Sequence, residues 1–327
     1  MMYSSDKSAI IDQLQSSLFA FCEPREDRVE VHNLLQTLSG ILVETMLLFE
    51  TPEEGLVCCL DNIAAQLNIS TETLAEDAIF SPAPAFELDC HAEQGRLLVK
   101  EILEDWMECT HEFRKFIETF TIQNLLVWED HGIERADLYA YLYNSSIRFM
   151  AYEIAAQELC EIVIDELIGG WGWTLLDNIS GLSAVSGYKL AQSLDQEQCM
   201  IFQGADIPKH MDHIIHVMTQ EAVRYGTPAG SDWKFGIAAN DVPPNPPWEI
   251  LCGVSPYADK ILDCLPLPDL TDQAAACAKA AGRLIAVAAG GEEPEYEHFI
   301  VKPLALSAMG ESYKSICSGL TLKQETI

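Results

Sequence analysis

Apolar residues that recur at the helical period are the feature that most limits what this chain can fold into. In the stretch 86–121 the large apolar side chains fall on one side of a helix. The stretch 133–168 is apolar around more of its circumference, which is typical of a central and mostly buried helix. No convincing strand-like alternation and no Asn-Gly or Asp-Gly hairpin turn is present. The sequence therefore predicts an all-α protein.

Local start and stop signals indicate where further helices lie. Thr51 precedes Pro52 and Glu54, which is typical of a helix N-terminus because Thr can cap it and Pro fits its first turn. Gly226 and then Pro228 are a stop signal for a helix that begins near Asp206. Together these signals and the apolar pattern predict helices over 206–225, 274–289 and 299–317.

A shift in composition divides the chain near residue 170. Residues 1–170 hold 32 acidic and 9 basic side chains, a net charge of −23, whereas residues 171–327 have a net charge of −9. Proline rises from 4 residues in the first part to 11 in the second. We therefore expect an acidic, bundle-like helical domain over 1–170. A second helical subdomain with long Pro/Gly-rich loops is expected over 171–327, packed on the first.

The whole chain combines a formal charge of −32 with a hydrophobic content of 49%. Enough apolar material for a packed core excludes intrinsic disorder. The deficit of Lys and Arg argues against binding to nucleic acid or to an anionic membrane. Residues 1–15 lack the apolar core of a signal peptide, and the apolar stretch 34–49 is too short and too polar to span a bilayer. We therefore expect a soluble, cytoplasmic protein.

The 11 cysteines do not form a recognisable metal or disulfide framework. No C-x-x-C is present, and the only close pair is Cys58 and Cys59. Cysteines that ligate zinc or iron–sulfur clusters usually have short, paired spacings. We interpret these cysteines as reduced, small apolar residues, and we predict no cofactor from them.

Two patterns leave a transition metal, iron or zinc, as an open alternative. His210, His213 and His216 share one face of the expected helix and can converge on one ion. The opposing interpretation is a solvated histidine face, because the apolar residues of this helix point the other way. Glu108 and His111 match the Glu-x-x-His element of di-iron bundles, although their expected helix turns them away from its apolar side.

Charged residues lie within the apolar pattern of 133–168. They are Arg135, Arg148, Glu153 and Glu166. If this helix is central, some of these charges are buried and must be paired or must shift in pKa. Internal ion pairs and a functional polar pocket are both consistent with this arrangement.

A long acidic stretch and a proline-rich loop are the candidates for binding a partner. Residues 29–95 contain twelve acidic side chains and no Lys or Arg. Such a density of like charge indicates either a basic partner or adaptation to salt. The loop 228–248 contains two tryptophans and a run of prolines, which favours a lid or a docking surface. The candidate partner-binding residues are Glu50, Glu53, Glu54, Glu72, Glu76, Asp77, Trp233 and Trp248.

These observations favour a non-catalytic accessory, assembly or adaptor protein whose acidic N-terminal surface docks a basic protein. No nucleophile elbow, phosphate-binding loop or H-E-x-x-H motif is present. Two alternatives stay open. One is a helical-bundle metal-dependent redox enzyme that uses the histidine helix, and the other is a mimic of nucleic-acid charge. The sequence leaves the oligomeric state undetermined.

Overall fold

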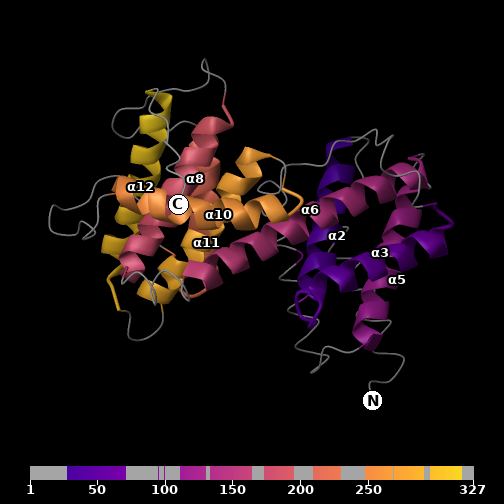
Figure 1. Cartoon of the computed structure of the whole chain (residues 1–327). Helices are drawn as coiled ribbons and strands as arrows, with labels where there is room; N and C mark the ends of the chain where they lie inside the picture. Colours follow the sequence, from indigo (N-terminus) through magenta and orange to yellow (C-terminus); the bar gives the residue numbers. More distant parts are fainter. Residues whose placement is uncertain are drawn as a thin grey trace. The chain divides into compact units, whose positions relative to one another are not determined.

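Helices and their connections make up all of the described parts of the chain, which confirms the all-α prediction (Figure 1). The computed structural model describes residues 28–70, 95, 99, 111–129, 133–163, 173–194, 209–229, 247–267, 269–290 and 295–318. The chain forms two compact units, Met1–Met150 and Ala151–Ile327. These units divide inside helix α6 (Arg135–Ile162), whereas the change of composition lies near residue 170. Composition changes later along the chain than the packing does.

The first unit contains α2 (Arg28–Met46), α3 (Pro52–Leu67), α5 (His111–Glu129) and the first part of α6. As predicted, α3 begins directly after Thr51 with Pro52 in its first turn, although the Thr51 side chain makes no capping hydrogen bond. Its C-terminal cap is Asn68, whose φ of 56° is left-handed. The backbone N–H groups of Asn68 and Ile69 then donate to the last free carbonyls of the helix, which closes its C-terminus.

Apolar faces of these four helices form the core of the first unit. On α5, the predicted apolar side is buried at Phe113, Phe116, Ile117 and Phe120. The earlier part of that predicted stretch lies largely outside the described residues. The Tyr139 hydroxyl is buried and donates to the carbonyl of Leu60 at 2.9 Å, which ties α6 to α3. This hydrogen bond satisfies a polar group that would be costly to bury alone.

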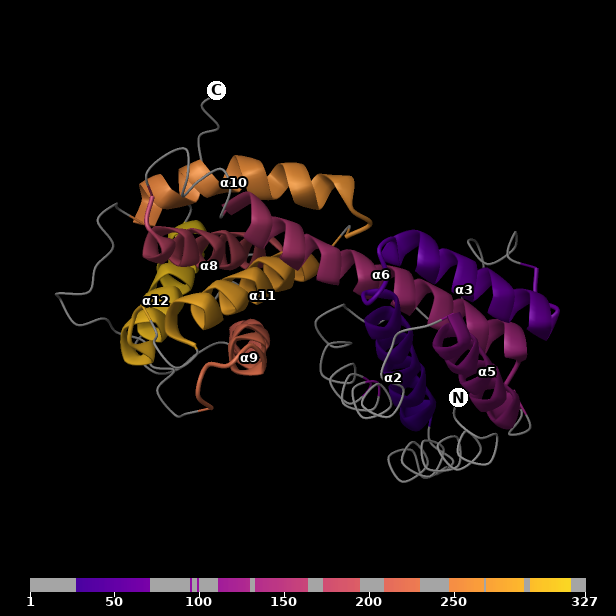
Figure 2. The same cartoon turned by 90° about the horizontal axis from the view of Figure 1, so that it is seen from below.

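The second unit contains the last part of α6 together with five further helices. These are α8 (Leu175–Gln192), α9 (Lys209–Arg224), α10 (Pro247–Cys264), α11 (Leu270–Ala289) and α12 (His298–Cys317). Figure 2 shows α8 between α10 on one side and α11 and α12 on the other, and α8 contacts all three. Thr174 and Asp177 form a reciprocal capping box at its start. Almost the whole circumference of α8 is buried, so it is the central helix of this unit.

The three helices predicted in the second part of the sequence correspond to α9, α11 and α12. The predicted stop after α9 is confirmed, because α9 ends at Arg224 and Gly226, two residues further on, has a φ of 107°. Of the predicted loop 228–248, residues 230–246 lie outside the described part, and α10 already begins at Pro247. Within the described residues, no helix is both long and apolar enough to cross a membrane.

Glycine allows two pairs of helices in the second unit to approach closely. A Cβ atom on Gly187 of α8 would overlap the backbone carbonyl of Met309 on α12. A Cβ atom on Gly282 of α11 would lie 2.5 Å from the carbonyl oxygen of Met218 on α9. Since these obstacles are backbone atoms, a larger residue could be accommodated only by moving a whole helix.

Gly187→Ala is expected to destabilise the protein, whereas Gly55→Ala is expected to be neutral or stabilising. The added methyl at 187 meets backbone and should cost about 1–3 kcal/mol of unfolding free energy. At Gly55, inside α3, the nearest atom is the Met46 sulfur at 3.4 Å, so the better helix propensity of Ala should add up to about 1 kcal/mol. Urea unfolding followed by circular dichroism measures both changes. Equal effects of the two substitutions would contradict this packing.

Candidate functional site

Four charged side chains of the second unit form the centre of an ion network that joins three helices, and Arg224 adds a longer contact, with its Nη1 3.4 Å from Glu221 Oε2. Lys279 of α11 places its Nζ 2.5 Å from Glu153 Oε1 of α6 and 3.6 Å from Glu221 Oε2 of α9. Arg283, one turn further along α11, donates from Nη2 to Glu153 at 2.8 Å and from Nε to Glu221 at 2.7 Å. Each carboxylate therefore contacts both cations, and each cation contacts both carboxylates.

Local structure explains why these groups meet. Lys279 and Arg283 are four residues apart and lie on the same face of α11. Gly282 lets α9 approach that face, and Glu221 lies at the point of approach. Lys279, Glu153 and Glu221 have side-chain exposures of only 0%, 2% and 2%. The ammonium group of Lys279 also lies 4.8 Å from the centre of the Tyr152 ring, a cation–π contact.

Electrostatics keep the Arg283 guanidinium charged. Burial lowers the pKa of the Arg283 guanidinium, but Glu153 and Glu221 outweigh that effect and hold it above its ordinary value. Burial raises the pKa of the nearby Cys160 to about 12, and the neutral thiol donates to the carbonyl of Ala280 at 3.3 Å. A thiol in that state is a poor nucleophile. The ion pairs therefore serve to hold α6, α9 and α11 together.

The charged residues that the sequence analysis noted within 133–168 lie in different environments. Glu153 forms an internal ion pair, one of the two possibilities that the sequence left open. Arg135 is partly exposed, pairs with Glu129 and donates to the carbonyl of Leu67 at the end of α3. Arg148 is half-buried, and Glu166 lies outside the described residues.

Sequence reasoning missed Glu221, Lys279 and Arg283. The available signal was two cations one turn apart in the Ala-rich stretch 270–289.

The first unit also has a buried carboxylate. Glu118 of α5 accepts from Arg114 at 3.1 Å and from the side chain of Asn62 on α3 at 3.3 Å. Cys59 lies beside this pair, and burial raises the pKa of its thiol far above the ordinary value. These contacts join α3 to α5 and leave the Cys59 thiol protonated.

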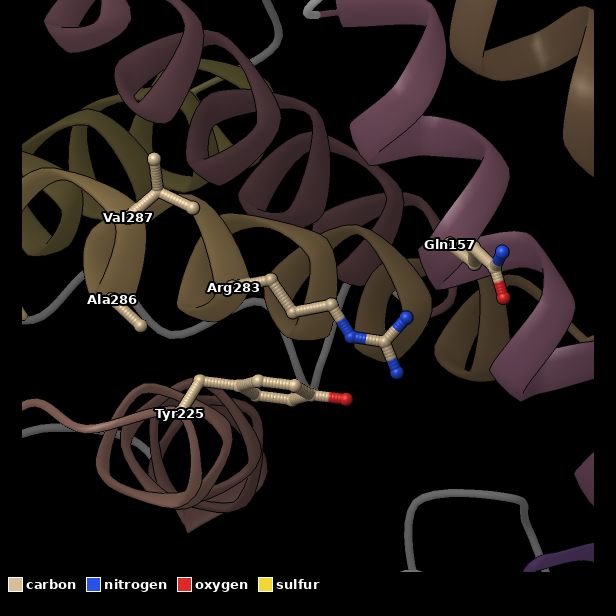
Figure 3. Close-up of a pocket in the computed structure, with 5 residues that line it drawn as sticks. All are labelled: Gln157, Tyr225, Arg283, Ala286 and Val287. Atoms are coloured by element: carbon tan, nitrogen blue, oxygen red, sulfur yellow. The ribbon is translucent and has the colours of Figure 1, made fainter. Parts of the chain in front are cut away.

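An open pocket of about 400 Å³ lies beside the ion network, between α6, α9 and α11 (Figure 3). Gln157, Tyr225, Arg283, Ala286 and Val287 line it. The guanidinium carbon of Arg283 lies 5.6 Å from the centre of the Tyr225 ring. Arg283 therefore belongs both to the buried network and to the surface of the pocket.

The histidine helix is α9, and its three histidines have separate environments. His210 shares a hydrogen bond of 2.8 Å with the buried hydroxyl of Tyr313 on α12. Burial lowers the pKa of His210, and the neighbouring His213 lowers it further. His213 and His216 are exposed, on the side away from the buried residues Met211, Ile214, Ile215, Met218 and Ala222.

No three His, Cys, Asp or Glu side chains are grouped to hold a metal ion in the part of the chain that the structure describes. The second metal candidate falls mostly outside that part. Glu108 is not described, and of His111 only the backbone, at the start of α5, is described.

The candidate partner-binding acids that are described lie on the surface of the first unit. Glu50, Glu53 and Glu54 are exposed, and so is Asp61 further along α3. Glu72, Glu76 and Asp77 lie outside the described residues, as does Trp233. Trp248 is 39% exposed in the first turn of α10.

Glu153→Gln is expected to lower the unfolding free energy by about 3–5 kcal/mol, because it leaves buried cations without one of their two counter-charges. Thermal or urea unfolding measures the loss. The matched control is Glu158→Gln on the exposed side of α6, which should change stability by less than about 0.5 kcal/mol. A small effect at Glu153 would contradict a stabilising network.

The neutral form of His210 should make stability dependent on pH. Its pKa in the folded protein lies below the ordinary value of 6.5, so below that pH the unfolded chain binds a proton that the folded chain resists. This contribution to stability is present above pH 6.5 and is lost as the pH falls. His210→Gln should therefore flatten the decline in unfolding free energy between about pH 7.5 and 5, relative to the wild type and to the His216→Gln control. An unchanged slope would contradict this assignment.

Comparison with known proteins leaves the function to be argued from these residues. No protein family, curated protein or solved structure matches the chain.

Proposed function

We propose that the protein acts by associating with a basic protein through an acidic surface on α3. This surface, the α3 acidic face, consists of Glu50, Glu53, Glu54 and Asp61 together with the apolar residues Leu48 and Val57. All four carboxylates are exposed, and α3 contains no Lys or Arg. The observation that carries the proposal is this single-sign, solvent-facing surface with apolar side chains among its charges.

The spacing of these residues fits recognition by a helix or an extended basic segment. Glu54, Val57 and Asp61 are separated by three and four residues, so they follow one side of α3. Leu48 and Val57 are 48% and 39% exposed and supply apolar contact area next to the carboxylates. A partner with Lys or Arg around an apolar residue complements this pattern in charge and in hydrophobicity.

Stabilisation of the helix explains only some of the carboxylates on the α3 acidic face. Glu53 and Glu54 lie in the first turn of α3, where a carboxylate is favoured by the helix dipole. Glu50 precedes the helix and Asp61 lies in its middle, so the dipole gives no comparable benefit to them. Their exposure beside further acids is consistent with a surface kept for electrostatic attraction to a partner.

Neutralising the α3 acidic face should weaken binding of the partner without unfolding the protein. The variant is Glu50→Gln, Glu54→Gln and Asp61→Asn, and the control is Glu249→Gln, Asp263→Asn and Glu311→Gln on exposed sites of the second unit. Each protein is tagged at its own locus, and the recovered partner is titrated against it at several salt concentrations. We expect roughly tenfold weaker binding and a smaller salt dependence for the α3 variant only.

Two results would contradict the proposal. The first is a partner whose affinity is the same for the wild type, the α3 variant and the control. The second is an affinity that does not fall as salt rises, because attraction between exposed charges is screened by ions.

A further inference from the structure

The pocket beside the ion network gathers features that the proposed function does not use. Val287 and Tyr225 are 63% and 52% exposed, the two most exposed large apolar side chains in the described residues. Both line this pocket, together with the methyl group of Ala286. Such a concentration of apolar surface around one charged group is typical of a ligand site.

Arg283 supplies hydrogen-bond donors that its own network leaves unused. Its Nε and Nη2 donate to Glu221 and Glu153, whereas Nη1 makes no hydrogen bond with the described residues. The side chain is 17% exposed, and Figure 3 shows the end of the guanidinium at the pocket, away from the backbone of α11. The two carboxylates hold it in place, so little conformational entropy is lost when a ligand binds to it.

Tyr225 completes the polar end of the pocket. Its ring lies next to the guanidinium, and in Figure 3 its hydroxyl group points past Arg283 toward the side where Gln157 lies. The Tyr225 hydroxyl makes no hydrogen bond within the part of the chain that the structure describes. The pocket therefore offers a charged donor and a neutral donor at one end and the apolar surface of Ala286 and Val287 at the other.

We propose that this pocket binds the carboxylate of a small organic acid that has an apolar body. The carboxylate accepts hydrogen bonds from Arg283 Nη1 and from the Tyr225 hydroxyl, while the body packs on Ala286 and Val287. Arg283 excludes a cationic ligand by repulsion. A dianionic phosphate fits less well, because the pocket lining provides one cation and Glu153 and Glu221 lie directly behind it. Arg224, whose guanidinium carbon lies 5.4 Å from the centre of the Tyr225 ring, does not line the pocket and pairs with Glu221.

Phenylacetate is a suitable probe, and phenylacetamide is its neutral counterpart of similar shape. Titration of the full chain, followed by calorimetry or ligand-observed NMR, should show saturable binding of phenylacetate in the millimolar range, as expected for about ten non-hydrogen atoms in an open site. Phenylacetamide should bind at least roughly tenfold more weakly, because it lacks the charge that pairs with Arg283. Inorganic phosphate at equal concentration should not displace phenylacetate.

A surface substitution tests the location without disturbing the ion network. Val287→Glu places a carboxylate at the pocket and should weaken phenylacetate binding at least roughly tenfold, through repulsion or by occupying Arg283 itself. Gln192→Glu is the matched control, because it adds the same charge at an exposed position of α8 that does not line the pocket, and it should bind within about threefold of the wild type. Both variants should keep the wild-type unfolding temperature, because positions 287 and 192 are exposed.

The proposal is overturned by any of four results. These are no saturable binding up to about 20 mM, equal binding of acid and amide, displacement by phosphate, or wild-type affinity in Val287→Glu. The experiment uses a site in the second unit, so its failure leaves the partner-binding proposal for α3 untouched.

Discussion

Mutual neutralisation of three buried charges and the partly buried Arg283 is the constraint on which the second unit depends. Removing Glu153, Glu221, Lys279 and Arg283 from water is expensive, and only close pairing makes it tolerable. Pairing at this distance fixes the register of α6, α9 and α11, because a shift of one turn in any of them would leave a charge buried alone. Gly282 allows α9 to approach α11 closely, and this approach brings Glu221 within reach of Lys279 and Arg283.

Charged groups have different roles in the interior and at the surface of the protein. Inside, the described ionisable groups act in structural contacts, such as Glu118 with Arg114, and the thiols of Cys59 and Cys160 are held protonated by burial. Outside, carboxylates on and before α3 stay hydrated and unneutralised by any basic residue of that helix. The chemistry available to another molecule therefore lies at the surface. This is the basis of the two proposals, association through the first unit and ligand recognition at the edge of the second.

Local features of the fold could be predicted from sequence, and long-range pairings could not. The start of α3 at Pro52 and the stop at Gly226 depend on neighbouring residues, so the sequence indicates them directly. The exposure of His213 and His216 also follows from the apolar face of their own helix. By contrast, Glu153 and Lys279 are 126 residues apart, and no local pattern pairs them. The division of the packing inside α6 likewise has no signal in the composition, because composition does not report which residues are in contact.

Hydrogen–deuterium exchange of the full chain, with and without its bound partner, tests the central claim of association through α3 most directly. Partner binding should slow exchange of the backbone amides of α3 and of the residues just before it, including Glu50 and Asp61, because a docked surface restrains the helix that carries it. Unchanged exchange throughout α3, with slower exchange confined to the second unit, would contradict the account and move the binding surface elsewhere.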